Sequence, residues 1–246
     1  MALATDNLRQ AYPEKSAAEL DREVKAVFQH LGLGGVEMLR LDLLRGQADL
    51  ERYFIISGKE HLERAFAMNR GVFLLTGHIG FWEAGTFLFP TLGFPTDFVT
   101  KTIRNPYVDR YFRKLREASG GHCLDSKKGA RRILRSLQQN RGIGVLLDQH
   151  ITRKEAVKVE FFGRPVWNTP IIAQIAMKQN IPVLPAYCYR TDDFRYRIII
   201  EPIIELADEP DEEAVVRNTA RLTASIEQAV RRQPDQWFWV HRRWRD

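Results

Sequence analysis

The chain has 246 residues, of which 44% are hydrophobic and 28% are charged, which is ordinary for a soluble globular protein with one substantial core. Its net charge of +6 favours an anionic partner: a phosphate-bearing ligand, an anionic membrane surface, an acidic carrier protein or nucleic acid. The two cysteines, Cys123 and Cys188, lack the spacing of a metal site or a disulfide framework, so we expect reduced core residues.

The N-terminal part of the chain predicts helices. A capping-box pattern begins a helix expected over residues 16–31, and the glycine-rich stretch 32–35 should break it. A second helix is expected over 36–44, a short strand over 53–56 and another helix over 61–69. The polar first residues contain no apolar core, so no secretory signal is expected.

The most informative stretch follows. Residues 72–75 form an apolar run typical of a strand buried on both faces, and a glycine-flanked turn then carries His78. Glu83 comes five positions later, at the start of a helix-compatible pattern. The two side chains can meet only if His78 lies in the turn and Glu83 near the first turn of the helix. Glu83 would then bind one imidazole nitrogen and leave the other as a general base, whereas the alternative is a loop histidine with an unrelated glutamate.

The rest of the chain alternates strands and helices. Strands are expected at 96–101, 122–124, 142–147, 183–190 and 195–201, and helices at 106–119, 127–140, 169–179 and 211–232, with a loop or hairpin over 151–166. Asp148 and Gln149 follow a buried strand, where ligands collect in open α/β sheets, although such an Asp is also a common turn residue. The pattern predicts an α/β fold with a single domain and a mainly parallel central sheet flanked by helices.

Several motifs are absent. The sequence has no Gly-x-Ser-x-Gly elbow, Walker loop, dinucleotide fingerprint or His-Glu-x-x-His helix, so it does not support a serine hydrolase, nucleotide phosphotransferase, simple dehydrogenase or zincin. His78 and Glu83 supply only two possible metal ligands, and we predict no metal site. The longest apolar stretch, 72–94, is interrupted by polar residues and glycines, so no membrane-spanning helix is expected.

Six segments in order carry a resemblance to a known family. They are His78-x4-Glu83, Arg104-Asn-Pro-x-x-Asp109, Leu115-Arg116, Asp148-Gln149, Phe161-Phe-Gly163 and Gln236-Trp-x-Trp-x-His-Arg-Arg-Trp244. This series resembles the late acyltransferases of lipid A biosynthesis, within the lysophospholipid acyltransferase superfamily. The resemblance covers nearly the whole chain and implies a glycerol-phosphate-acyltransferase-like fold. One acyltransferase domain would span 1–246, with N-terminal helices at about 16–45, an α/β core at about 53–205, and a C-terminal helix and aromatic-basic tail at 211–246.

The resemblance also implies a reaction and its residues. A fatty acyl group would move from acyl carrier protein or acyl-CoA to a hydroxyl of a membrane lipid, most simply a lipid A precursor. His78 would deprotonate that hydroxyl and Glu83 would orient His78. Arg116 would stabilise the thioester oxygen or bind phosphate. Arg104, Asn105, Asp109, Asp148 and Gln149 would shape the substrate pocket. The thioester is a co-substrate, and no metal or redox cofactor is required.

Membrane contact is a further expectation. Family members usually begin with a membrane-spanning helix that this sequence does not show, so either that helix was removed or this chain binds the cytoplasmic face of the bacterial inner membrane peripherally. An anionic membrane surface would then meet basic residues and exposed aromatics. The candidates for membrane contact or, alternatively, for the core are Phe81, Trp82, Phe87, Phe89 and the tail tryptophans.

The sequence is compatible with three alternative functions. The chain could be a catalytically silent lipid- or carrier-binding module, or an acyltransferase for another glycolipid or lysophospholipid. The aromatic-basic tail also allows nucleic-acid binding, but the sequence has no nucleic-acid motif and we expect no such partner.

Overall fold

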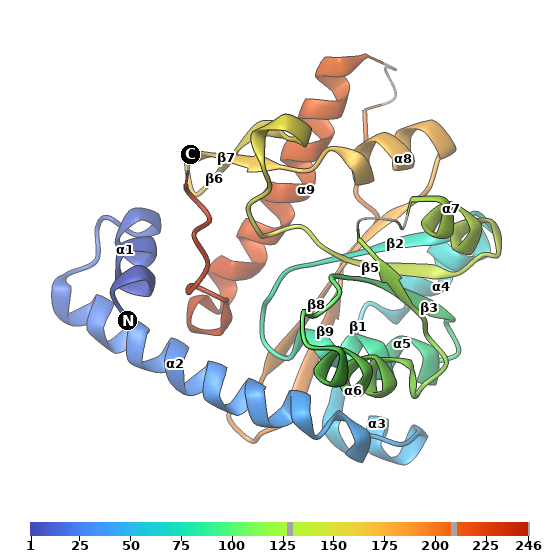
Figure 1. The fold of residues 1–246 in the computed structure, drawn as a ribbon, viewed down its shortest axis with the longest axis horizontal. Coiled ribbons are helices and arrows are strands. Elements are labelled where there is room, and N and C mark those ends of the chain that lie inside the picture. The colour runs from blue at the N-terminus through green and yellow to red at the C-terminus, as the bar shows by residue number, and fades with distance from the viewer. Residues whose placement is uncertain (127–129, 208–210, 246) are drawn as a thin grey trace.

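A central sheet organises the molecule (Figure 1). The computed structural model describes residues 1–126, 130–207 and 211–245. Within them, seven strands form one sheet in the order β1-β9-β8-β2-β5-β3-β4. All neighbouring pairs are parallel except β8 and β9, so the sheet is mainly parallel, as predicted. A separate antiparallel hairpin, β6 and β7, lies largely within the segment 151–166, where a loop or hairpin was predicted.

The bounds of the elements are as follows. The strands are β1 Phe54–Ser57, β2 Val72–Thr76, β3 Thr96–Thr100, β4 Cys123–Asp125, β5 Gly142–Leu146, β6 Val157–Phe161, β7 Arg164–Asn168, β8 Val183–Arg190 and β9 Tyr196–Ile200. The α-helices are α1 Ala2–Ala11, α2 Ala17–Leu39, α3 Gln47–Tyr53, α4 Lys59–Ala67, α5 Gly85–Thr91, α6 Pro106–Glu117, α7 Ala130–Gln138, α8 Ile171–Gln179 and α9 Glu212–Arg232. Short 3-10 helices are η1 Leu41–Leu43, η2 Trp82–Ala84, η3 Arg153–Glu155 and η4 Pro234–Gln236.

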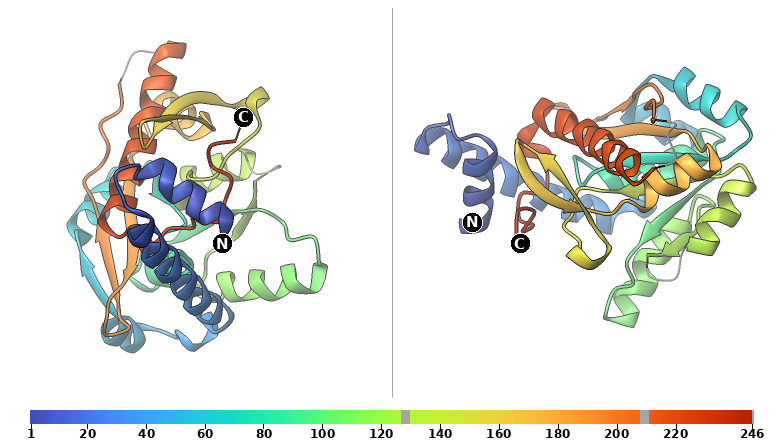
Figure 2. Two further views of the ribbon diagram at one scale, coloured as in Figure 1. Left: turned by 90° about the vertical axis from the view of Figure 1, so that its left-hand side faces the viewer. Right: turned by 90° about the horizontal axis from the view of Figure 1, so that it is seen from above.

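The core lies on both faces of the sheet, and helices cover each face (Figures 1 and 2). On β2, Phe73 and Leu75 join the core built with α1, α2, α7, α8 and α9. Val72 and Leu74 point the other way, into the core built with α3, α4, α5 and α6. This alternation explains why the strand reads as a continuous apolar run rather than an apolar–polar repeat.

The predicted break of the first N-terminal helix at residues 32–35 was wrong. Helix α2 continues from Ala17 to Leu39 through the glycines at 32–35, and α1 precedes it where no helix was predicted. Each glycine costs about 1 kcal/mol in a helix interior relative to alanine. Tertiary contacts on both sides offset that cost: Val27 is buried before the glycines, and Glu37 pairs with Arg190 after them. Residues 127–129 of the predicted 127–140 helix lie outside the described residues.

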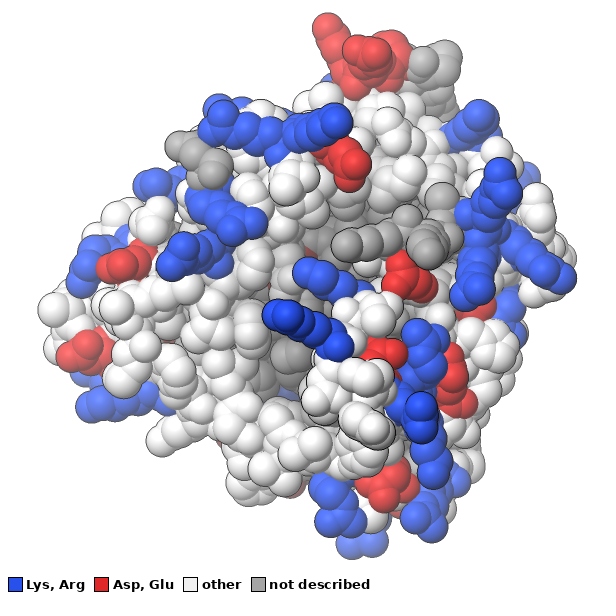
Figure 3. Space-filling view, viewed as in Figure 1, with Lys and Arg blue, Asp and Glu red and all other residues white. Residues whose placement is uncertain are grey.

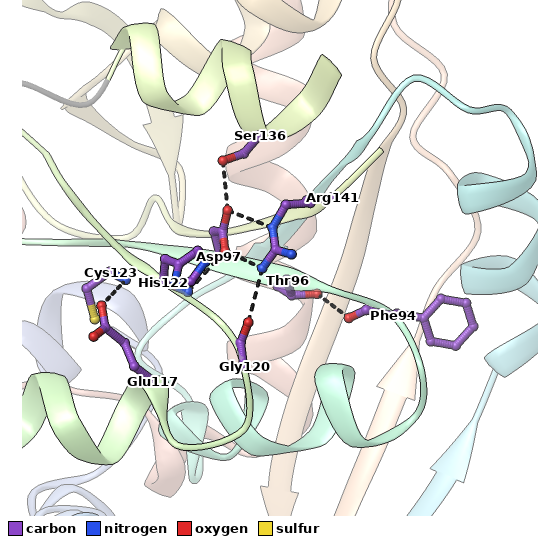
Figure 4. Close-up of polar contacts among 9 residues, drawn as sticks. All are labelled: Phe94, Thr96, Asp97, Glu117, Gly120, His122, Cys123, Ser136 and Arg141. Carbon is purple, nitrogen blue, oxygen red and sulfur yellow. Dashed lines mark hydrogen bonds and ion pairs between the residues drawn. The ribbon is translucent and has the colours of Figure 1, made fainter. Parts of the chain in front are cut away.

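A buried ion pair between Asp97 and Arg141 links β3 to the beginning of β5 (Figure 4). It lies at the sheet edge opposite the carboxyl ends of β2 and β5. Asp97, at the start of β3, is 1% exposed and accepts two hydrogen bonds from the Arg141 guanidinium at 2.6 and 2.9 Å. Ser136 of α7 donates a third at 2.7 Å. Burial would raise the pKa of Asp97, but the hydrogen bonds from Arg141 and Ser136 outweigh it and lower that pKa. The pair ties α7, β3 and the entry to β5 together.

Candidate active site

His78 lies just beyond the carboxyl end of β2 and contacts Asp148, which lies just beyond the end of the adjacent β5. The imidazole Nδ1 is 2.8 Å from Asp148 Oδ1, and the backbone N–H of His78 donates to Asp148 Oδ2, also at 2.8 Å. Two parallel neighbours therefore bring an imidazole and a carboxylate together at one sheet edge, where ligands bind in open α/β folds.

Glu83 does not take the place predicted for it. Both of its carboxylate oxygens accept hydrogen bonds from Arg116 of α6, at 2.6 and 2.8 Å. The Nδ1 position is taken by Asp148, and His78 Nε2 is 3.3 Å from the side-chain nitrogen of Gln149. The physical reason is that η2 directs Glu83 toward α6, whereas the sheet order brings Asp148 directly beside His78. The predicted direct pairing of His78 with Glu83 is thus replaced by two pairs, His78–Asp148 and Arg116–Glu83.

The carboxylate of Asp148 is held ionised. Its burial would raise the pKa, but the charge of His78, the hydrogen bonds from His78 and a hydrogen bond from the Trp237 indole lower that pKa to about 2. Burial likewise opposes protonation of His78, and Asp148 followed by Glu83 overcomes this and raises the pKa of the imidazole. Since Asp148 accepts the proton on Nδ1, the neutral imidazole has its lone pair on Nε2.

A cavity of about 810 Å³ opens beside the imidazole. Its polar lining includes His78, Glu83, Arg116 and Gln149. Apolar side chains form much of the remaining wall, among them Leu74, Leu88, Phe89, Phe98, Val99 and Ile172. A mainly apolar wall with several polar groups, in a cavity of this size, is typical of a site for a largely hydrocarbon ligand. The face seen in Figure 3 is hollowed near its centre and carries more Lys and Arg than Asp and Glu.

The three residues predicted from the Arg-Asn-Pro segment lie at the start of α6. Asn105 caps the helix by accepting from the backbone of Tyr107 at 3.0 Å, and Asp109 accepts from the backbone of Ile103 at 2.8 Å. Arg104 is exposed. None of the three is among the described residues that line the cavity, whereas Arg116 of the same helix is. Their predicted part in substrate binding stays a prediction, and their observed contacts shape the beginning of α6.

Most of the aromatic candidates for membrane contact lie in the core instead. Trp237 is 1% exposed and donates its indole N–H to Asp148 Oδ2 at 2.8 Å, and Trp239 is fully buried. Phe81, Phe87 and Phe89 are also buried, while Trp82 and Trp244 are partly buried. The contact of Trp237 with the site was missed, because spacing along the sequence does not reveal which residues a tail meets after folding.

The structure adds two observations on metals and membranes. Among the described residues, no cluster of three or more His, Cys, Asp or Glu side chains is arranged to hold a metal ion. No helix in the part of the chain that the structure describes is long and apolar enough to cross a bilayer.

Comparisons with known proteins bear on this geometry. The model of the family described as bacterial lipid A biosynthesis acyltransferase matches residues 2–246. A lipid A biosynthesis acyltransferase of Haemophilus influenzae is 24% identical over 96% of this chain and 73% of its own length. The lipid A biosynthesis palmitoleoyltransferase of Escherichia coli is 23% identical over 99% of this chain and 78% of its own.

Two further similarities are more distant or partial. A phosphatidylinositol mannoside acyltransferase of Mycobacterium tuberculosis is 29% identical over 55% of this chain and 44% of its own length. Among solved structures, the 1-acyl-sn-glycerophosphate acyltransferase PlsC of Thermotoga maritima aligns with a TM-score of 0.43 and 13% identity, over 92% of this chain and 87% of its own.

Proposed function

Because the chain belongs to the bacterial lipid A biosynthesis acyltransferase family, and is therefore an acyltransferase, we propose that it moves a fatty acyl group from a carrier-protein or CoA thioester to a hydroxyl of a lipid A precursor. The observation that carries this proposal is an imidazole bound through Nδ1 to a buried carboxylate, at the wall of a large apolar cavity. The acyl chain would lie in that cavity with its thioester carbonyl beside His78.

The proposed reaction is direct transfer. Nε2 of His78 removes the proton from the acceptor hydroxyl as the hydroxyl oxygen attacks the thioester carbonyl carbon. The tetrahedral intermediate then breaks its carbon–sulfur bond, and the imidazolium returns the proton to the leaving thiolate. Asp148 holds Nδ1–H in place and stabilises the imidazolium that forms between the two steps. The products are an ester and a free thiol, and the transfer consumes no metal or redox cofactor.

Arg116, held by Glu83, would donate hydrogen bonds to the oxyanion that forms on the thioester carbonyl, or to a phosphate of a substrate. A guanidinium has five N–H donors, and the Glu83 carboxylate takes two of them. Those that remain can donate to the thioester oxygen or to a phosphate on either substrate, and a donor to a developing oxyanion is worth on the order of 3 kcal/mol. Glu83 would fix the position of Arg116 at the cavity wall.

We further propose peripheral attachment at the cytoplasmic membrane face through a surface that we call the α2–α6 face. It consists of the exposed apolar residues Leu33, Val36, Leu39, Leu43, Tyr107, Val108 and Tyr111. The two helices meet there, since the hydroxyl of Tyr111 donates to the carbonyl of Leu39 at 2.7 Å. Arg104 and Arg110, which flank Tyr107 and Val108 in the chain, are exposed, and so is Arg40, which pairs with Asp42 at 3.7 Å. Apolar residues with a basic rim suit an anionic bilayer, and α6 leads from this face to Arg116 in the cavity.

The acceptor is tested by offering the purified protein acyl-carrier-protein and acyl-CoA donors with three lipids: a lipid A precursor, a phosphatidylinositol mannoside and a lysophospholipid. The mannoside is included because one relative carries that name. Mass spectrometry of the products, and of lipids from cells with and without the protein, identifies the acceptor. Preference for either of the other lipids would overturn the lipid A assignment while keeping the acyltransferase.

The base is tested with His78→Ala. We expect a loss of about 10²–10⁴-fold in transfer, and the exposed His122, which is not among the described cavity residues, provides the matched control His122→Ala. A folded His78→Ala protein with undiminished transfer would contradict the mechanism. Binding of donor and lipid without any turnover by the wild type would instead favour a catalytically silent module.

A further inference from the structure

The C-terminal tail pairs with the loop that carries the proposed base. The backbone N–H of Gly80 donates to the carbonyl of Gln236 at 2.8 Å, and the backbone N–H of Phe238 donates to the carbonyl of His78 at 3.1 Å. Between these bonds, Ile79 and Trp237 form an antiparallel β-bridge. The main chain on both sides of the imidazole is therefore fixed by the tail, which turns back at the end of α9 (Figure 1).

The side chain of Trp237 also contacts the carboxylate of Asp148. Asp148 Oδ2 accepts from the indole N–H at 2.8 Å and from the His78 backbone at 2.8 Å, while Oδ1 faces the imidazole at 2.8 Å. Asp148 and Trp237 are 2% and 1% exposed, so bulk water does not replace the indole donor in the folded state. Two donors on one oxygen fix the carboxylate plane and leave the other oxygen for the imidazole.

The indole is itself held on several sides. Its ring packs against Trp239 at 4.6 Å and Phe161 at 5.4 Å between centroids. The side-chain amide of Asn7, from α1, donates to the carbonyls of Trp239 and His241 at 2.7 and 2.8 Å. These contacts come from α1, the β6–β7 hairpin and the tail. They leave the indole N–H little freedom to turn away from the carboxylate.

We propose that Trp237 is a positioning residue for acyl transfer: its indole N–H orients Asp148 and sets how strongly that carboxylate attracts the proton of His78. The proposal rests on the proposed function of His78 as the base. A neutral donor on a carboxylate withdraws part of its negative charge from the imidazole. Without the N–H, Asp148 holds the imidazolium more tightly, so the pKa of His78 rises and less of the imidazole is free to act as a base.

Other ionisable groups surround the His78–Asp148 pair and stay unchanged in the test. Glu83, with its partner Arg116, lies on the cavity side and its charge favours protonated His78. On the tail side, Arg243 donates to the carbonyl of Gln149 at 3.0 Å and its charge interacts with that of Asp148. Burial lowers the pKa of His241 to about 4, so this neighbour is neutral at pH 7.

The test replaces Trp237 by β-(3-benzothienyl)alanine, which keeps the two-ring shape and exchanges N–H for sulfur, and in parallel by phenylalanine. The matched control is the same pair of replacements at Trp239, whose indole donates to the carbonyl of Pro234 at 2.6 Å instead. The His78 pKa is measured by NMR titration of ¹⁵N-histidine-labelled protein without substrate, with the signal assigned by its loss in His78→Ala. The pH dependence of kcat is recorded alongside.

We expect both Trp237 variants to raise the His78 pKa by about one unit. At pH values below the wild-type pKa, this lowers the fraction of neutral His78 imidazole about tenfold. The acid limb in the pH dependence of kcat should move to higher pH by the same amount, with KM unchanged. The Trp239 variants should keep the wild-type His78 pKa. A His78 pKa that is unchanged in a folded Trp237 variant, or that rises equally in the Trp239 variants, would overturn the proposal. Because this titration needs no turnover, that result leaves the mechanism standing, whereas an active His78→Ala protein overturns the mechanism itself.

Discussion

Asparagine at position 148 should disable the site more severely than glutamine at position 83. Three donors converge on Asp148: the imidazole Nδ1–H, the His78 backbone N–H and the Trp237 indole N–H. An amide has one oxygen and one NH₂ group, so at least one of the three donors must face an NH₂ group. If that donor is Nδ1–H, the imidazole changes tautomer and presents a proton at Nε2, where the proposed mechanism requires a lone pair.

The size of the effect follows from the charge of the pair. The pKa of Asp148 falls from the ordinary 3.8 to about 2, which corresponds to about 2 kcal/mol in favour of the ionised form. The folded-state pKa lies below the unfolded one, so this stabilisation is present above pH 4 or so and is lost as the pH falls through about 2. Asp148→Asn should therefore lower the free energy of unfolding at neutral pH by about 2 kcal/mol. It should lower kcat by about 10³–10⁴-fold, as loss of a tautomer-fixing carboxylate does elsewhere.

Glu83→Gln acts differently because its oxygens contact Arg116. It removes a charge that raises the pKa of His78, so the acid limb of the pH–rate profile should move to lower pH. The Nδ1 contact with Asp148 remains, and the loss of kcat should be smaller than for Asp148→Asn.

The assay is acyl transfer by both variants across the pH range, with urea unfolding of each to report stability. An Asp148→Asn enzyme close to wild type, beside an inactive but folded Glu83→Gln enzyme, would refute the assignment of Asp148 as the orienting carboxylate. It would restore the pairing predicted from the His-x4-Glu spacing.

The remaining predictions concern the fold and the surface. Gly80→Ala should unfold the site loop or the whole protein, because Gly80 has φ +58° and a Cβ there would lie 1.7 Å from the carbonyl oxygen of Cys188; a thermal melt unchanged from wild type would contradict this. Asp97→Ala should cost about 3–5 kcal/mol in urea unfolding, since it leaves Arg141 uncompensated in a buried pair, and a cost below 1 kcal/mol would show that the pair is dispensable. Leu39→Glu should weaken sedimentation with anionic vesicles without shifting the melting temperature, because that side chain is 49% exposed; unchanged vesicle binding would remove the α2–α6 face from the membrane proposal.

Local sequence patterns correctly predicted that His78 and Asp148 each follow a buried strand. The apolar run of β2 and the glycine turn after it placed His78 at a strand end, and the same reasoning placed Asp148 after β5. Both predictions depend on residues close together in sequence. What local pattern does not contain is the order of strands in the sheet, and the adjacency of β2 and β5 is what brings Asp148 to His78. Spacing therefore favoured Glu83, the nearer carboxylate along the chain.

The helices show the same limit. The glycines at 32–35 argue locally against a helix, yet Glu37 binds Arg190 at a sequence separation of 153 and α2 continues to reach it. The short α1 has no side-chain cap and is held by buried Leu8 and by the contact of Asn7 with the tail, 232 positions away. In each case a distant partner supplies the free energy that local propensity lacks.

The bond between Trp237 and Asp148 joins positions 89 residues apart, and the tail that carries it becomes available only after α9 has been made. A nascent chain in which β2 and β5 have already paired still lacks the indole donor and the main-chain bonds to the loop at 78–80. The loop at 78–80 and the Asp148 carboxylate therefore reach their observed arrangement only after the chain has been made through Phe238.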